Sequence, residues 1–483
     1  MDGARNMFPR PLSDGHGRQA RAIGNLVVPL AHEATDMRAT DTAGILPGRS
    51  GAVSASSRVT STVRRGDVES TNGRLTPATS PGPGIRTSTT ATRTTTTRTT
   101  SSAPAPSADH PLAPYHADFS FGDLVAAYLD CRRTKRCTAS ALEFERDQER
   151  LLCALDRALR DGSYRPGPSM CFAIVRPKPR EVWAAAFPDR IVHHLLYNRV
   201  APAIEAAFIA DSCACIPGRG TLYAARRLEA KIRSITQNWT RPAFYLKCDL
   251  SNFFVSIDKQ ILRDLLAARI RDPWWLSLAE LILFHDPRPG CELRGDPRRL
   301  ALVPAHKSLL NQAADLGLPI GNLSSQFFAN VYLDVLDRHV KHDLRVRHYI
   351  RYVDDFILLH ESPQQLNAWR EDLEAFLPER LRVNLNPKKT ILQPVDRGVD
   401  FVGHVVKPHR RTIRRRTFNE TLHRLERLHQ ADVRVSANSY FGLLRQASHS
   451  HRDRARLAKL VLRRGFSVDR EFTRTFKKGA REL

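Results

Sequence analysis

The stretch that most constrains this chain is residues 348–360, HYIRYVDDFILLH, in which two apolar, β-branched and aromatic runs flank a pair of aspartates. Such runs on either side of a short polar pair predict the two strands of a hairpin, with Asp354 and Asp355 at its tip. Adjacent carboxylates repel each other, and they are tolerated best where a divalent cation lies between them and a ligand. A solvated turn is the alternative for an isolated pair.

A third carboxylate elsewhere in the chain favours a cation site over a solvated turn. Residues 244–258, FYLKCDLSNFFVSID, predict a second apolar strand that runs into Asp249 and is followed by an aromatic pair and a helical segment. A two-metal phosphoryl-transfer site needs three carboxylates from separate strand ends, because two Mg²⁺ ions must be held about 4 Å apart over the attacking and leaving oxygens. The sequence therefore offers Asp249, Asp354 and Asp355 as candidate catalytic residues.

The segment YVDD inside RYVDDFILL, together with the upstream pattern D-x-x-x-F-F, closely resembles the palm domain of reverse transcriptases, in which these aspartates bind the metals. The resemblance continues in order along about 300 residues. It implies an α+β right-hand polymerase fold with fingers, an antiparallel palm and a helical thumb. It also implies an RNA-directed DNA polymerase that uses an RNA template, a DNA or RNA primer and dNTPs. The implied ligands of two Mg²⁺ ions, with Mn²⁺ as an alternative, are Asp249, Leu250, Asp354 and Asp355.

Composition agrees with a nucleic-acid partner. The net charge is +25, of which residues 116–483 carry +20, and such an excess is the footprint of a protein that follows a phosphate backbone. Residues 1–112 form a Thr/Arg/Pro/Ser-rich extension with no apolar periodicity, which predicts disorder. This extension is a flexible nucleic-acid-binding arm, a dispensable linker or an overextended start of the reading frame. The predicted domains are fingers with N-terminal helices (113–240), palm (241–408) and a basic helical thumb (409–483).

Basic residues ahead of Asp249 are candidates for binding the incoming nucleotide. The segment 178–200, KPREVWAAAFPDRIVHHLLYNRV, resembles the fingers motif in which cations meet a triphosphate. A planar guanidinium can grip two phosphate oxygens at once. Lys178 and Arg180 are the first candidates and Arg190 is the second; a basic surface strand is the alternative. His193 and His194 lie on a predicted helix without a matching ligand pair, so we expect them to be structural.

Further nucleotide contacts are implied by the resemblance. Phe254 matches the bulky ring that lies beneath the sugar and excludes a 2′-hydroxyl, which indicates a DNA product, although core packing would also explain it. Residues 319–326, PIGNLSSQ, occupy the place of the motif that lies against template and nucleotide, with Gly321 and Gln326 as candidates. Residues 285–318 before this motif are predicted to be an irregular basic insertion in the palm.

The remaining candidates concern the leaving group and the nucleic acid. Lys389 matches the palm lysine proposed to protonate departing pyrophosphate, the alternative being a solvated loop lysine. The turn around Arg219 lies close to nucleic acid in the family, but a capping turn with Thr221 at the helix start explains it equally. Residues 399–406 resemble a primer-grip strand pair with Gly403 at a close approach. The arginines that follow are predicted to track the duplex backbone, and they are Arg414, Arg415 and Arg416.

The form I-G-N-L-x-S-Q at residues 320–326 departs from the common Q-G-x-x-x-S-P and resembles enzymes of diversity-generating retroelements. A phage-defence reverse transcriptase, acting on a non-coding RNA or without a template, is the alternative. A non-catalytic RNA-binding protein of the same fold is the alternative from another class. Without a specificity domain, an accessory protein or structured RNA would supply targeting. The eight cysteines lack a zinc-ligand pattern, and no apolar window reaches about 18 residues, so we expect a cytoplasmic protein with reduced thiols and no membrane span.

Overall fold

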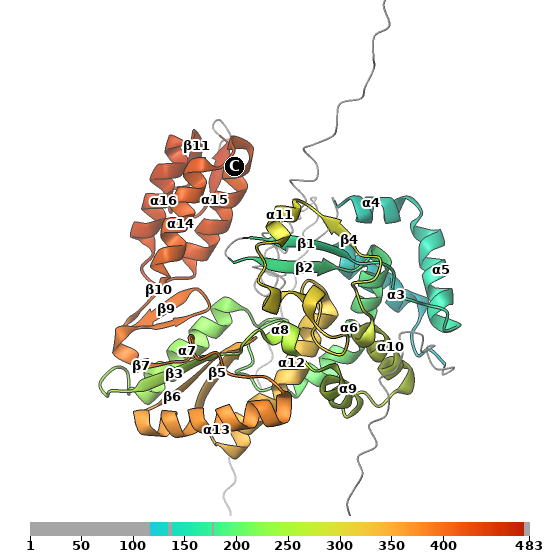
Figure 1. The fold of residues 1–483 in the computed structure, drawn as a ribbon. Coiled ribbons are helices and arrows are strands. Elements are labelled where there is room, and N and C mark those ends of the chain that lie inside the picture. The colour runs from blue at the N-terminus through green and yellow to red at the C-terminus, as the bar shows by residue number, and fades with distance from the viewer. Residues whose placement is uncertain (1–115, 134–137, 176–177, 478–483) are drawn as a thin grey trace, which may run out of the picture. The chain divides into compact units, whose positions relative to one another are not determined.

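The computed structural model describes residues 116–133, 138–175 and 178–477 (Figure 1). These ranges combine helices with small, mostly antiparallel sheets, so the predicted α+β fold class is confirmed. The extension predicted for residues 1–112 lies outside the described residues.

The sheet that carries the three aspartates has four antiparallel strands in the order β5-β6-β3-β7. Its strands are β3 (Phe244–Asp249), β5 (His348–Tyr352), β6 (Asp355–His360) and β7 (Ile391–Pro394). Successive side chains of a strand point to opposite faces, so both faces of this sheet can be buried. Leu246 packs in the core on the side of helix α13 (Pro363–Leu381). Its neighbour Tyr245 packs on the side of helix α7 (Thr221–Ile235).

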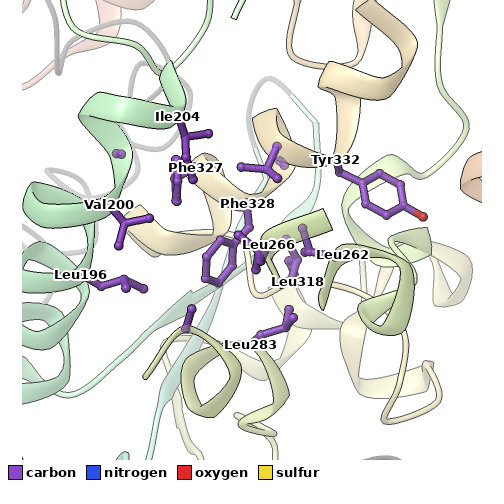
Figure 2. Close-up of a cluster of buried hydrophobic side chains, with 14 of the residues drawn as sticks. Leu196, Val200, Ile204, Leu262, Leu266, Leu283, Leu318, Phe327, Phe328 and Tyr332 are labelled. Atoms are coloured by element: carbon purple, nitrogen blue, oxygen red, sulfur yellow. The ribbon is translucent and has the colours of Figure 1, made fainter. Parts of the chain in front are cut away.

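Helix α12 (Leu323–Arg338) follows the loop at residues 319–322 and is buried along most of its length. Figure 2 shows Phe327 and Phe328 of this helix among leucines of neighbouring helices. Those neighbours are α6 (Phe187–Ala206), α9 (Lys259–Ala267) and α10 (Pro273–Phe284). Fully buried rings contribute roughly 3 kcal/mol or more each, so this cluster fixes the start of α12 and the loop before it.

A second sheet has the order β2-β1-β4. Its strands are β1 (Met170–Ile174), β2 (Arg180–Ala184) and β4 (Glu292–Arg294). Strand β4 pairs in parallel with β1, so part of the segment 285–318 joins the strands predicted as fingers. The prediction of an irregular insertion in the palm is corrected in this respect. The sequence does not reveal this pairing because β4 is short and exposed, and its partner is far away in the chain.

The remaining elements before the sheet's last strand are short helices. They are α3 (Phe121–Arg132), α4 (Ala139–Arg146), α5 (Gln148–Arg160), α8 (Phe253–Ser256), α11 (Pro297–Leu300), the 3₁₀ turns η1 (Ala305–Lys307) and η2 (Leu309–Asn311), and the π-helical turn η3 (His339–Asp343). Helix α7 begins at Thr221 with Gly220 at the N-cap position, and no side chain caps it. The predicted capping role of Thr221 is therefore wrong.

The C-terminal part begins with a three-stranded meander and continues as a helical unit with its own core. The elements are η4 (Val395–Arg397), β8 (Val399–Phe401), β9 (His404–Lys407), β10 (Arg410–Ile413), α14 (Arg415–Arg427), α15 (Gln430–Arg445), α16 (His451–Arg463), β11 (Phe466–Val468) and β12 (Thr475–Lys477). The predicted basic helices are present. Residues 410–413 form a strand instead of opening the helical segment, and the β11-β12 hairpin is an addition to the expected fold.

No helix within the described ranges has the length and apolarity needed to cross a bilayer. Within these ranges, no cysteine is joined in a disulfide bond.

Candidate active site

The turn between β5 and β6 presents Asp354, and β6 begins at Asp355. Strand β3 ends at Asp249, which lies directly opposite Asp355 in the antiparallel register. Residues opposite each other in such a ladder have Cα atoms about 5 Å apart, so the two carboxylates are near neighbours. The backbone N–H of Leu250 donates to the carbonyl of Asp354 at 3.3 Å, which joins the end of β3 to the turn. The structure thus brings together the four residues predicted to bind metal.

The carboxylates of this group disfavour one another's charge. Burial, followed by the negative charges of Asp355 and Asp249, raises the pKa of Asp354 to about 7. Burial also raises the pKa of Asp355; Asp249 adds to this shift, and the ammonium of Lys247 opposes it. Carboxylates that are desolvated and crowded in this way gain from a cation placed among them.

Lys389 supplies part of that positive charge. Its ammonium forms an ion pair with the carboxylate of Asp249. Asn386 holds the loop in place, because its backbone N–H donates to the carbonyl of Asp249 at 2.8 Å and its own carbonyl accepts from the N–H of Lys389 at 3.0 Å. Lys389 is therefore paired with one of the candidate carboxylates as well as partly exposed, and its catalytic role stays a prediction.

The candidate metal ligands at this site are all oxygen donors. Three carboxylates and a nearby backbone are hard oxygen ligands of the type that Mg²⁺ prefers. Within the described ranges, no three His, Cys, Asp or Glu side chains already converge as a ready set of metal ligands. The ammonium of Lys389 instead neutralises Asp249. The chemistry of the residues therefore fits a divalent cation, provided that the ion replaces this ammonium.

Two of the predicted triphosphate ligands, Lys178 and Arg180, lie near the aspartates. Burial lowers the pKa of Lys178, and the next contributions in the same direction come from Lys389, Lys307 and Arg180, while Asp249 opposes them. These groups must lie within electrostatic reach of one another. Lys178 and Arg180 are exposed, so both cations are accessible to a ligand.

Lys307 belongs to this cationic group, and the sequence reasoning did not identify it. Its neighbour Ser308 donates a hydrogen bond to the buried carboxylate of Glu181, and the backbone N–H of Leu309 donates to the same group at 2.8 Å. Glu181 follows Arg180 on β2, so this anchor places the exposed Lys307 beside the fingers cations. A buried acid next to a serine more than a hundred residues away carries no local sequence signal.

Arg190 lies elsewhere. Its Nε donates to the carbonyl of Ala185 at 2.7 Å, and burial lowers the pKa of its guanidinium. These contacts give Arg190 a structural function at the start of α6, so the structure does not place it with Lys178 and Arg180 as a phosphate ligand.

Phe254 is half-buried, with its ring centroid 5.4 Å from that of the fully buried Phe253. Its carbonyl accepts from the N–H of Leu318 at 2.8 Å. Both rings lie on the short helix α8, where Phe253 is part of the core and Phe254 packs against that core while remaining partly exposed. Gln326 is also half-buried, on the first turns of α12.

The backbone of Gly321 lies close to the backbone of strand β2. Its φ is +132°, and an added Cβ would collide with the carbonyl oxygen of Trp183 and lie 3.0 Å from Val182. On either side of it, the carbonyl of Ile320 accepts from the N–H of Trp183 at 2.7 Å, and the side chain of Asn322 accepts from the N–H of Ala185 at 3.1 Å. The predicted reason for glycine, close approach of a ligand, is replaced here by docking of the loop onto β2.

The candidates for nucleic-acid binding divide into internal and exposed groups. Arg219 donates to the carbonyls of Ile209 and Ser212 at 2.8 and 3.0 Å, so it braces its own loop. Gly403 has a φ of +83° in the turn between β8 and β9, with open space around its Cα. The structure therefore assigns Arg219 an internal contact and leaves the Gly403 turn accessible.

Arg414 lies between the meander and the aspartates. It pairs with Asp400 at 2.8 Å, which raises the pKa of its guanidinium, and Asp355 adds to that shift. Arg415 and Arg416 are well exposed at the start of α14, with side-chain exposures of 66% and 80%. Arg415 and Arg416 pair with Asp453 and Glu420 at the surface, so both guanidinium groups remain accessible to solvent.

Comparison with known proteins shows which family this chain resembles. Residues 177–406 match the family described as reverse transcriptase (RNA-dependent DNA polymerase). Protein YkfC of Escherichia coli (strain K12) is 25% identical over 320 residues, which cover 59% of this chain and 77% of YkfC. The group II intron-encoded protein LtrA of Lactococcus lactis subsp. cremoris is 19% identical over 306 residues, which cover 53% of this chain and 49% of LtrA.

Two solved telomerase structures are also similar. Telomerase from Candida albicans, in complex with a TWJ fragment of telomeric RNA, aligns with a TM-score of 0.40 and 13% identity over 62% of this chain and 54% of that chain. Apo telomerase from Candida tropicalis, truncated from its C-terminal domain, aligns with a TM-score of 0.37 and 11% identity over 53% and 57%. This chain therefore spans about half the length of LtrA and of these telomerases.

Proposed function

Because this chain belongs to the bacterial reverse transcriptases, a family of RNA-directed DNA polymerases, we propose that Asp249, Asp354 and Asp355 form its catalytic centre. The observation that carries the proposal is the register that places Asp249 opposite Asp355 at the end of a buried sheet. Burial and the charge of Asp249 raise the pKa values of Asp354 and Asp355, and an arrangement that disfavours two buried carboxylates serves no packing purpose.

The proposed reaction is transfer of a nucleotidyl group from a dNTP to the 3′-hydroxyl of a primer annealed to RNA. Asp249, Asp354 and Asp355, with the backbone of Leu250, would hold two Mg²⁺ ions, and these ions supply activation of the hydroxyl and charge neutralisation on the phosphates. Lys389, whose ammonium contacts Asp249, is the proposed proton donor for the departing pyrophosphate.

The other residues bind and orient the substrates. Lys178, Arg180 and Lys307 supply fixed positive charge for the triphosphate, in agreement with their mutual electrostatic influence. The ring of Phe254 excludes the 2′-hydroxyl of a ribonucleotide. The turn at Gly403 and the arginines at the start of α14 contact the sugar-phosphate backbone of the primer-template duplex.

The biological context we favour is a diversity-generating retroelement, on the basis of the I-G-N-L-S-S-Q sequence at residues 320–326. Neighbouring DNA decides between this context and phage defence. A template repeat and a variable repeat beside the gene would support diversification, and their absence would contradict it.

Primer extension tests the proposed function directly. The full chain is incubated with a DNA primer annealed to RNA, four dNTPs and Mg²⁺, beside a variant that carries both Asp354→Asn and Asp355→Asn. We expect extension by the wild type and none by the variant, because the variant loses two of three anionic ligands. If neither protein extends the primer while both bind the duplex, the chain is a binding protein and the catalytic proposal fails.

Substitution of Lys307 by glutamine tests the cationic group. A charge-assisted hydrogen bond to phosphate is worth about 1.5–3 kcal/mol, so the KM for dNTP should rise by a factor of about 10 to 150, with little change in kcat. Arg298→Gln, on α11 of the same segment, is the control, and its KM should match the wild type. An unchanged KM in Lys307→Gln, or equal changes in both variants, would remove Lys307 from the nucleotide site.

A further inference from the structure

The turn that carries Asp354 has a backbone conformation that needs support. Val353 has a φ of +54°, in the left-handed region that β-branched residues rarely adopt. Such a conformation is unfavourable for a branched residue and persists only where its surroundings enforce it. The position of the Asp354 carboxylate depends on this peptide, because Asp354 is the next residue in the chain.

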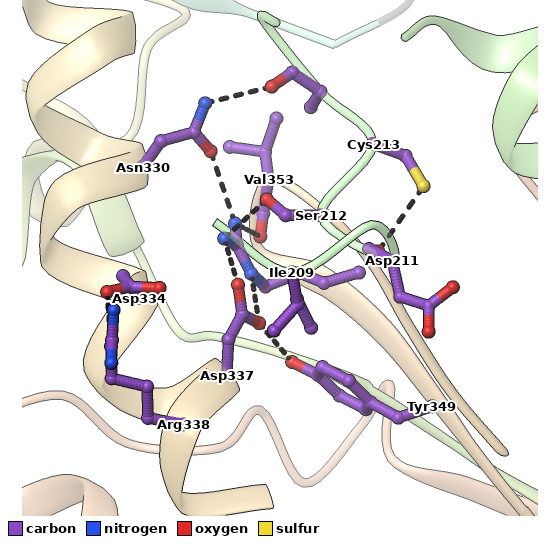
Figure 3. Close-up of polar contacts among 12 residues, drawn as sticks. Ile209, Asp211, Ser212, Cys213, Asn330, Asp334, Asp337, Arg338, Tyr349 and Val353 are labelled. Carbon is purple, nitrogen blue, oxygen red and sulfur yellow. Dashed lines mark hydrogen bonds and ion pairs between the residues drawn. The ribbon is translucent and has the colours of Figure 1, made fainter. Parts of the chain in front are cut away.

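Arg351 is the side chain that contacts this peptide from within the protein. Its exposure is 1%, and its Nη1 donates to the carbonyl of Val353 at 3.2 Å. Figure 3 shows the surrounding polar group, with Asn330, Asp337 and Ser212 directed toward a common centre. The guanidinium pairs with fully buried Asp337 through Nε at 2.8 Å and Nη2 at 2.6 Å.

The remaining donors of Arg351 are also used. Nη2 donates to the hydroxyl of Ser212 at 2.8 Å and Nη1 to the amide oxygen of Asn330 at 3.3 Å. With Asp337 and Val353, these acceptors account for all five N–H groups of a guanidinium. A buried guanidinium whose N–H groups all donate hydrogen bonds has one orientation, so it can hold the Val353 carbonyl at a defined place.

The residues that accept hydrogen bonds from the Arg351 guanidinium are themselves held by further hydrogen bonds. Tyr349 donates its hydroxyl proton to Asp337 at 2.8 Å, and Asn330 donates to the carbonyl of Ala214 at 2.8 Å. The backbone of Arg351 is held on the same side, since its N–H donates to Asp211 and its carbonyl accepts from Cys213, at 2.9 and 3.0 Å. The guanidinium therefore rests on helix α12, on strand β5 and on the loop at residues 211–214.

We propose that Arg351 is a positioning residue for catalysis, which holds the strained Val353 peptide and thereby sets the Asp354 carboxylate for cation binding. This inference rests on the proposed function of Asp354. A buried ion pair is often no more stabilising than an apolar replacement, so the Arg351–Asp337 pair is not explained by stability alone. Its contact with the turn assigns it a geometric role.

The test measures cation binding by the full chain without any reaction. Mn²⁺ is titrated into metal-free protein and followed by electron paramagnetic resonance, for the wild type and for Arg351→Lys. Lysine keeps the charge facing Asp337 but cannot reach Val353 as well. We expect Mn²⁺ to bind about tenfold more weakly, as for other residues that orient metal ligands. Arg351→Lys should also lower kcat without changing the KM for dNTP.

Two further variants separate positioning from stability. Arg269→Lys alters a different ion pair, in which Arg269, just after α9, contacts the buried Asp334 of α12. We expect its Mn²⁺ affinity to match the wild type. Val353→Gly removes the cost of the left-handed conformation, so adding it to Arg351→Lys should restore part of the lost affinity.

Equal Mn²⁺ affinity in Arg351→Lys and the wild type, or equal losses in Arg351→Lys and Arg269→Lys, would overturn the proposal. If Arg351→Lys does not fold, Ser212→Ala carries the same test, since it removes one bond that orients the guanidinium and keeps both charges. An unchanged affinity in that variant would likewise contradict the positioning role. Failure of the wild type to extend a primer would contradict the proposed function instead, because the Mn²⁺ titration does not depend on turnover.

Discussion

Asp355→Asn is expected to lower the rate of primer extension at least about 100-fold. In metal-free protein, the same substitution is expected to raise the melting temperature by about 2 °C. The loss of activity follows from removal of an anionic ligand, since metal assistance is worth several kcal/mol. The gain in stability follows from the raised pKa of Asp355, which shows that its surroundings disfavour the ionised form. A neutral amide of the same shape relieves the repulsion from Asp249 across the ladder.

Primer extension and thermal melting in the presence of a chelator measure the two effects. Glu371→Gln, an exposed acid on α13, is the charge-matched control and should change neither quantity appreciably. A lower melting temperature in Asp355→Asn would mean that Lys247 and Arg414 stabilise this carboxylate more than Asp249 repels it. Retained activity would show that Asp355 does not hold a catalytic cation.

Gly321→Ala is expected to destabilise the fold by about 3 kcal/mol and to impair primer extension. The backbone at φ +132° is closed to residues with a Cβ, and the new methyl group would meet the carbonyl of Trp183. A carbonyl that is part of a strand cannot move aside without breaking the hydrogen bonds between β2 and the loop at residues 320–322. The loop must therefore detach from β2, and with it the start of α12.

Chemical denaturation measures this loss, and Gly442→Ala is the matched control. Gly442 lies inside α15, and a Cβ there would meet nothing within 4 Å. Alanine at a helical position is more favourable than glycine by roughly 0.5–1 kcal/mol, so this variant should be slightly stabilised. Equal stability of Gly321→Ala and the wild type would show that the contact with Trp183 is not a tight one.

The local elements around the aspartates could be predicted from the sequence because their signals are local. The apolar runs on either side of Asp354 and Asp355 specify a hairpin, and the run before Asp249 specifies a strand. Juxtaposition of Asp249 with Asp355 required a topology, and this was available only through resemblance to a family. The roles of these residues remain predictions until the variants are measured.

The features that the sequence did not reveal depend on partners far away in the chain. Strand β4 pairs with β1, and Ser308 donates a hydrogen bond to Glu181; more than a hundred residues separate the partners in each case. Arg190 and Arg219 are indistinguishable from ligand-binding arginines in the sequence, yet the fold supplies both with backbone carbonyls. An arginine's charge predicts that it needs acceptors, but only the fold decides whether a ligand or the protein itself provides them.

The ion pair between Lys389 and Asp249 has a consequence for the order of events during catalysis. Asp249 already has a counterion in the ammonium of Lys389, so this ammonium would have to leave the carboxylate before Asp249 could serve as a metal ligand. Lys389 would then be released only when metal is bound. A proton donor for pyrophosphate would thus become available at the stage when a leaving group is present, and it would stay engaged while the site is idle.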